Sequence, residues 1–140
     1  MKTYLHLFFI TVFLLVSCGD DQKEAQDKLL DKVMVVHDEI MPKMGAIMKY
    51  KKQLKAKIDE LTAEGKEDNE ARIAELKEAI ESLDNSHEGM MNWMREFDTD
   101  FEGKVEEDVM SYLNGQMAKI EEVGKMTNLA LKKAEDLLKE

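Results

Sequence analysis

The sequence predicts an all-α fold, an elongated antiparallel three-helix bundle that follows an N-terminal signal peptide. The 140 residues are 44% hydrophobic and 36% charged and include a single Pro, a composition typical of long amphipathic helices. Apolar residues recur every three or four positions over long stretches. The formal charge of -10 argues against a nucleic-acid binder. The single Cys excludes a disulfide framework, and the length argues against a multi-domain enzyme.

Residues 1–17 are predicted to be a lipoprotein signal peptide. The apolar run from Tyr4 to Val16 is shorter than the roughly 20 residues that a membrane-spanning helix needs. It ends in Leu15-Val16-Ser17-Cys18, which resembles the bacterial lipoprotein box, where small residues precede a cysteine that is acylated and becomes the mature N-terminus. The resemblance implies that Cys18 carries acyl chains such as palmitate and anchors the protein to a membrane of the cell envelope, with the outer membrane favoured.

Residues 18–24 follow as the lipidated Cys and a polar, acidic segment. The segment is predicted to be a solvated tether between the lipid and the folded part, residues 25–140. An acidic tract directly after the lipidated cysteine also looks like the surface-export signal of some envelope lipoproteins. The sequence therefore leaves open whether the protein faces the periplasm or the cell surface.

The first two predicted helices, residues 25–62 and 68–97, form a hairpin. Each carries a series of mostly apolar residues at alternating steps of three and four. The first series is Leu30, Val33, His37, Ile40, Met44, Ile47, Lys51, Leu54, Ile58 and Leu61. The second series is Ile73, Leu76, Ile80, Leu83, His87, Met90, Met94, Phe97 and Phe101. Between the helices, Gly65 is expected to supply the left-handed residue that ends the first helix.

The two series also predict how the hairpin pairs. Facing positions of an antiparallel hairpin have residue numbers with a nearly constant sum, and one register satisfies both series along their whole length. It places both histidines of the mature chain on the inner seam between the helices. His37 lies opposite Met94, and His87 lies opposite Met44.

The third predicted helix, residues 100–139, begins at Thr99-Asp100-Phe101-Glu102, which has the spacing of a capping box. Its apolar series is broader and weaker than the other two. It comprises Val105, Val109, Leu113, Ile120, Val123, Thr127, Ala130, Ala134 and Leu137. We expect this helix to cover the hairpin, a partner or both, so the oligomeric state stays open.

Pro42 predicts a kink in the first helix. Proline removes one backbone hydrogen bond of a helix and costs about 3 kcal/mol, and Gly45 weakens the next turn. The apolar series continues through both residues, which favours a kink over a break. A groove for a partner is expected beside this kink, lined by Met41, Met48, Met91 and Trp93.

Methionines gather near the same point, together with both histidines. Seven of the 11 methionines are Met34, Met41, Met44, Met48, Met90, Met91 and Met94. Thioether and imidazole groups suit Cu(I), so one hypothesis is a Cu(I) or Ag(I) site made by His37, His87, Met44, Met90 and Met94. The alternative is that the methionines fill the core, that the histidines are structural or pH-sensitive, and that Trp93 is a packing anchor.

Two segments carry a family resemblance. His37-Asp38-Glu39-Ile40-Met41-Pro42-Lys43-Met44-Gly45 and Met90-Met91-Asn92-Trp93-Met94, behind the lipoprotein box, resemble a group of small bacterial envelope lipoproteins that are sometimes labelled after viral A-type inclusion proteins. The group implies a lipoprotein with a helical, coiled-coil architecture, and it implies no activity.

The sequence contains no Gly-rich phosphate loop, no HExxH motif, no EF-hand and no Cys-x-x-Cys pair. We therefore expect a non-enzyme: a membrane-anchored, helical structural or partner-binding module with an envelope protein as partner. No resident cofactor is expected. The rival interpretation is a lipoprotein that binds Cu(I) or Ag(I).

Overall fold

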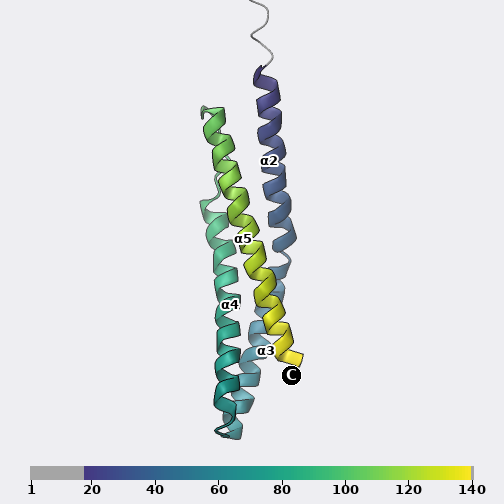
Figure 1. The fold of residues 1–140 in the computed structure, drawn as a ribbon, viewed down its shortest axis with the longest axis vertical. Coiled ribbons are helices and arrows are strands. Elements are labelled where there is room, and N and C mark those ends of the chain that lie inside the picture. The colour runs from purple at the N-terminus through teal and green to yellow at the C-terminus, as the bar shows by residue number, and fades with distance from the viewer. Residues whose placement is uncertain (1–17, 140) are drawn as a thin grey trace, which may run out of the picture.

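The computed structural model describes residues 18–139, and the predicted signal peptide, residues 1–17, lies outside them. The described part is all-α, with one long bent helix and two further helices packed together (Figure 1). The bent helix consists of α2 (Cys18–Ile40) and α3 (Lys43–Glu64), and it is followed by α4 (Asn69–Glu96) and α5 (Glu106–Lys139). The predicted three-helix fold is confirmed. No helix within residues 18–139 is long and apolar enough to cross a membrane.

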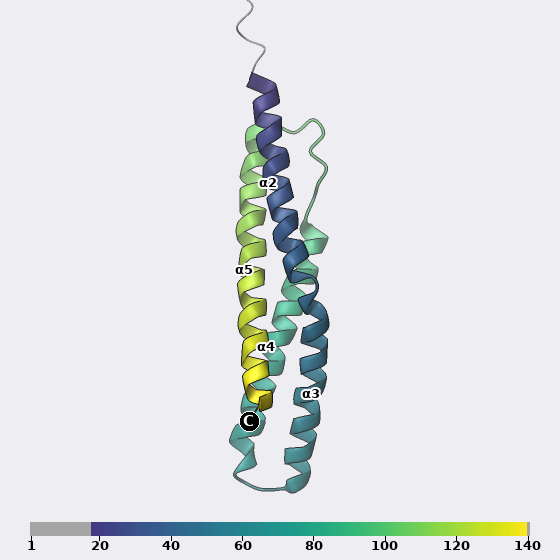
Figure 2. The ribbon, with the colours of Figure 1, turned by 90° about the vertical axis from the view of Figure 1, so that its right-hand side faces the viewer.

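The two halves of the rod are built differently. In one half, α3, α4 and α5 pack against each other. In the other half, α2 packs on α5, and no Cα atom of α2 lies within 8 Å of one in α4 (Figure 2). The predicted hairpin therefore holds for α3 with α4. Beyond the kink the predicted pairing does not continue, because α2 takes α5 as its neighbour instead.

The kink lies where Pro42 predicts it. Pro42 has no N–H to donate, and α2 ends two residues before it at Ile40. The Met41 N–H still reaches the His37 carbonyl at 2.9 Å, and Pro42 keeps helical angles of φ -61° and ψ -24°. The chain therefore bends without losing its helical phase, and Met44 in the next turn is again buried.

The hairpin tip also agrees with the prediction. Gly65 adopts φ 62°, in the left-handed region, and its N–H donates to the Thr62 carbonyl at 3.2 Å. The Asn69 side chain donates to the Leu61 carbonyl at 3.0 Å, which joins the two ends of the turn. Glycine reaches this conformation at little steric cost.

The predicted start of the third helix is wrong. Residues 97–105 form a non-helical linker, and α5 begins at Glu106 instead of residue 100. Aspartate side chains hold turns here instead. Asp98, just before the predicted capping box, accepts from the Asp100 N–H at 2.8 Å, and Asp100, within it, accepts from the Glu102 N–H at 3.2 Å. Short Asp side chains compete with helix formation in this way.

At the other end, α2 extends back to Cys18. The expected helix started at residue 25, so the polar segment 18–24 is helical here. Its residues from Asp21 to Glu24 are solvent-exposed.

The core follows the predicted series in the bent helix and in α5, whereas in α4 the predicted Leu76, Leu83 and Met90 are buried and the alternate positions shift by one residue. Ala79, Ser86 and Trp93 are buried, whereas the predicted Ile80 and His87 are half-buried. This shift arises because α4 packs against both α3 and α5, so its most buried line faces between its two neighbours. Periodicity along one helix does not contain that information.

Candidate functional site

The five side chains considered for Cu(I) lie in different environments. Met44 and Met90 are buried members of the hydrophobic core. His37 and His87 are half-buried, and Met94 is 42% exposed. Within residues 18–139 there is also no group of three or more His, Cys, Asp or Glu side chains that could hold a metal ion. A metal bound by all five donors would have to enter the packed core between the helices.

Trp93 joins the ends of α2 and α4. Its ring is 5% exposed and is stacked between His37, at a centroid distance of 5.6 Å, and Phe97, at 4.6 Å. At the edge of the imidazole, His37 Nδ1 lies 2.9 Å from Asp38 Oδ1. Trp93 therefore acts as a packing anchor at the kink, and His37 contributes to the same stack.

The stack continues into the linker and α5. Phe97 lies 6.3 Å from Tyr112, and Phe101 meets Tyr112 edge-on at 6.0 Å. The Tyr112 hydroxyl accepts a hydrogen bond from the Asp98 N–H at 2.7 Å. Five rings thus connect α2, α4, the linker and α5, and this arrangement, which we call the aromatic stack, was not predicted as a unit.

Asp98 organises the linker electrostatically. Its Oδ2 lies 2.9 Å from the Lys104 ammonium, and this hydrogen bond, together with the backbone N–H of Asp100, lowers the pKa of Asp98. The same contact with Asp98 raises the pKa of Lys104. Both side chains lie at the surface, 48% exposed for Lys104 and 54% for Asp98, so the pair holds a surface turn.

The four residues expected to line a partner groove are separated. Trp93 is buried in the aromatic stack, and Met41 and Met91 are half-buried against the core. Met48 is 55% exposed, on the outer side of α3. The large indole is buried because its apolar surface contributes most when it is removed from water. Of the four, Met48 presents the most accessible apolar side chain.

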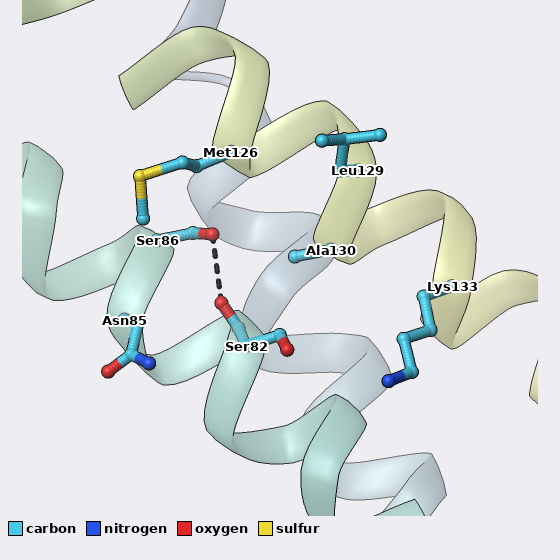
Figure 3. A pocket seen from close by; sticks show the side chains of 7 residues that line it. All are labelled: Ser82, Asn85, Ser86, Met126, Leu129, Ala130 and Lys133. Atoms are coloured by element: carbon cyan, nitrogen blue, oxygen red, sulfur yellow. Dashed lines mark hydrogen bonds between the residues drawn. The ribbon is translucent and has the colours of Figure 1, made fainter. Parts of the chain in front are cut away.

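A shallow groove runs between α4 and α5 (Figure 3). It has a volume of about 260 Å³ and is lined by Ser82, Asn85, Ser86, Met126, Leu129, Ala130 and Lys133. The Ser86 hydroxyl donates to the Ser82 carbonyl of its own helix at 2.9 Å. The small side chains of Ser82, Ser86 and Ala130 form the floor of the groove. Met126 leans toward Ser86, and Leu129, on the outer side of α5, is 61% exposed.

The sequence carried a signal for this groove. Small residues recur at steps of three and four in α4, at Ala79, Ser82 and Ser86, and Ala130 and Ala134 repeat the spacing in α5. Small side chains on both sides of a helix pair leave room at the surface between larger neighbours. The exposed Leu129 at its edge then makes the groove partly apolar.

Comparison with known proteins gives no match among protein-family models, curated proteins or solved structures.

Proposed function

We propose that the mature chain is a lipid-anchored protein of the bacterial envelope, a non-catalytic helical module that binds a protein partner. The observation that carries the proposal is that Cys18, the cysteine of the lipoprotein box, lies on the N-terminal side of α2, at the opposite end of the bent helix from the hairpin tip. α2 forms one extremity of the rod (Figure 1). Acyl chains on Cys18 would therefore attach the protein by its end and leave both flanks of the bundle accessible.

The dimensions of the bent helix support a role at a distance from the membrane. The helical chain from Cys18 to Glu64 rises about 1.5 Å per residue, so the hairpin tip lies roughly 70 Å from the lipid if the rod stands upright. Such a rod presents surface along its whole length to other envelope proteins. The resemblance to the envelope lipoprotein group supports the same anchor and architecture.

The α4–α5 groove supports partner binding. Its apolar edge at Met126 and Leu129 is exposed, next to a floor of small residues. A shallow groove of this kind suits the apolar side chains of a partner helix. Glu78 and Lys133 form an ion pair of 2.9 Å beside it, which provides a polar rim.

The anchor is tested by labelling cells that express the full chain with a palmitate analogue and separating membrane from soluble proteins. We expect wild type to be labelled and membrane-bound, and Cys18→Ser to lose both properties because the serine hydroxyl is not acylated in place of the thiol. Ser17→Ala keeps a small residue in the lipoprotein box and serves as the matched control. Equal labelling of wild type and Cys18→Ser would contradict the proposal.

Partner binding is tested by photo-crosslinking in the same cells. A photoreactive phenylalanine analogue in place of Leu129 should give a discrete protein adduct, whereas the analogue in place of exposed Lys132 should give a weaker one. Failure of every exposed position to give a protein adduct would contradict a binding function.

A further inference from the structure

Positive charge in this acidic chain is concentrated on α3. Residues 40–58 contain six lysines and no Asp or Glu, although the whole chain has a net charge of -10. Some of these lysines are used inside the bundle. Lys51 forms an ion pair with Asp84 of α4, and Lys57 donates to the Leu137 carbonyl near the end of α5 at 3.3 Å.

Three other lysines of this segment point to solvent. Lys49, Lys52 and Lys55 are exposed, and no ion pair in the described part of the chain includes any of them. Their spacing of three residues puts neighbouring ammonium groups close together on the helix surface, and like charges at this spacing destabilise a helix. We call these three residues the lysine face of α3.

Some exposed lysines elsewhere in the chain pair with acids one turn away. Lys28 pairs with Glu24 at 2.6 Å, and Lys139 pairs with Glu135 at 2.8 Å. In the lysine face three like charges follow one another at this spacing, and within residues 18–139 Asp59, one turn after Lys55, forms no ion pair with it. A sequence feature that weakens a helix, and that no contact within the fold offsets, is expected at a functional surface.

Apolar side chains complete the surface. Met48 and Ala56 lie four residues before and after Lys52, so the three follow one line along the helix. A shallow hollow on the outer side of α3 is lined by Met48, Lys51, Lys52, Lys55 and Ala56, with the one acidic side chain of its lining, Asp59, at its end. The exposed thioether of Met48 can adapt to an apolar residue of a partner, and the ammonium groups flank it.

We propose that the lysine face, with Met48 and Ala56, is the docking surface for an acidic segment of a partner protein. The proposal deepens the function given above and rests on it. Carboxylates spaced by three or four residues on a partner helix would meet Lys49, Lys52 and Lys55, and an apolar residue between them would pack on Met48. Binding would replace the repulsion between lysines by attraction across the interface.

Two other occupants fit this surface less well. A symmetric pair of copies anchored through Cys18 in one membrane would bring lysine face against lysine face, which is repulsive. The anchoring membrane is far away, because Lys49 lies roughly 45 Å along the helix from Cys18 in an upright rod. Helices that lie in a lipid surface also insert bulky residues such as Trp, Phe and Leu, whereas this surface offers Met48 and Ala56.

The proposal is tested by photo-crosslinking from the full, anchored chain, with a photoreactive phenylalanine analogue in place of Met48. We expect an adduct with one protein, and mass spectrometry should locate the adduct in a segment rich in Asp and Glu. Replacing the lysine face by Lys49→Gln, Lys52→Gln and Lys55→Gln should lower the adduct yield about tenfold, because three favourable charge contacts are lost. Glutamine has a good helix propensity, so the fold is kept.

A matched control removes the same charge elsewhere. Lys32→Gln, Lys77→Gln and Lys132→Gln change exposed lysines on α2, α4 and α5 and should leave the adduct yield within about twofold of wild type, since surface charges far from the interface act weakly through salt. An equal loss of yield in both triple variants would overturn the proposal. An adduct with lipid, with a second copy of the chain, or with a segment lacking acidic residues would overturn it as well.

The analogue in place of Leu129 separates this inference from the proposed function. A protein adduct from position 129 without one from position 48 overturns the docking surface on α3 and leaves the binding module intact. Absence of protein adducts from both positions overturns the two together.

Discussion

Trp93 offers the sharpest test of how the rod is held together at its kink. Its ring is almost fully buried between His37 and Phe97, so Trp93→Ala removes a large apolar side chain from a packed site. Such truncations typically cost about 3–5 kcal/mol, which is a large part of the roughly 5–15 kcal/mol that stabilises a domain. Met94→Ala is the matched control, because Met94 is the next residue and is 42% exposed.

Urea unfolding of residues 19–140, followed by circular dichroism, measures both variants. With a urea dependence of about 1–3 kcal/mol per molar, Trp93→Ala should lower the unfolding midpoint by about 2 M, and Met94→Ala should change the free energy of unfolding by less than about 1 kcal/mol. Because Trp93 is the only tryptophan, its fluorescence in wild type should also shift to the red on unfolding. Equal midpoints for the two variants would show that Trp93 is not a packing anchor.

Three further predictions concern other parts of the chain. Gly115→Ala should stabilise α5 by about 0.5–1 kcal/mol, because an added Cβ meets nothing within 4 Å. Gly124→Ala should stabilise the protein less, or destabilise it, since its Cβ would lie 3.0 Å from Ile40 Cδ1. The midpoints of urea unfolding compare the two variants. The pKa of Asp98 is lowered by the hydrogen bond from Lys104 and then by the Asp100 N–H, so its contribution to stability is present above about pH 3.9 and is lost as the pH falls through the lower folded-state pKa. Asp98→Asn should therefore be less stable than wild type at pH 7, and the difference should shrink as the pH falls below about 4. A difference that stays constant from pH 7 to pH 2 would contradict the argument. Competitive Cu(I) titration should give equal binding by wild type and by a His37→Ala, His87→Ala double variant, because Met44 and Met90 are buried in the core. Clearly weaker Cu(I) binding by the double variant would favour the copper alternative.

The features that the sequence predicts well are those decided by the local backbone. Pro42 bends the helix because it lacks an N–H, and Gly65 ends the next helix because it adopts a positive φ. The start of α5 is decided by tertiary contacts instead. Residues 99–102 have the spacing of a capping box, yet the Tyr112 hydroxyl and Lys104 hold this segment as a non-helical linker. A four-residue pattern gives no information about such contacts with residues outside it.

The candidate site was only partly predictable for a related reason. Heptad periodicity assigns His87 to the seam, but the packing of α4 against two neighbours buries Ser86 and leaves His87 half-buried. The run of lysines in residues 40–58 is visible in the sequence. The sequence does not show which of these lysines have partners, because the partners of Lys51 and Lys57 come from α4 and α5.

The different neighbours of α2 and α3 give the rod an uneven mechanical profile. α4 ends at Glu96, so α2 meets α4 only near the kink, where His37 stacks on Trp93, and packs mainly on α5. From Asp21 to Lys32 no side chain of α2 is buried, and Val33 is the first that is. Backbone amides of this stretch should exchange with solvent faster than those of α3, because local opening exposes little apolar surface. In an anchored protein, the end next to the lipid would be a compliant base, and the three-helix half beyond the kink would be the stiff part that holds a bound partner in a defined orientation.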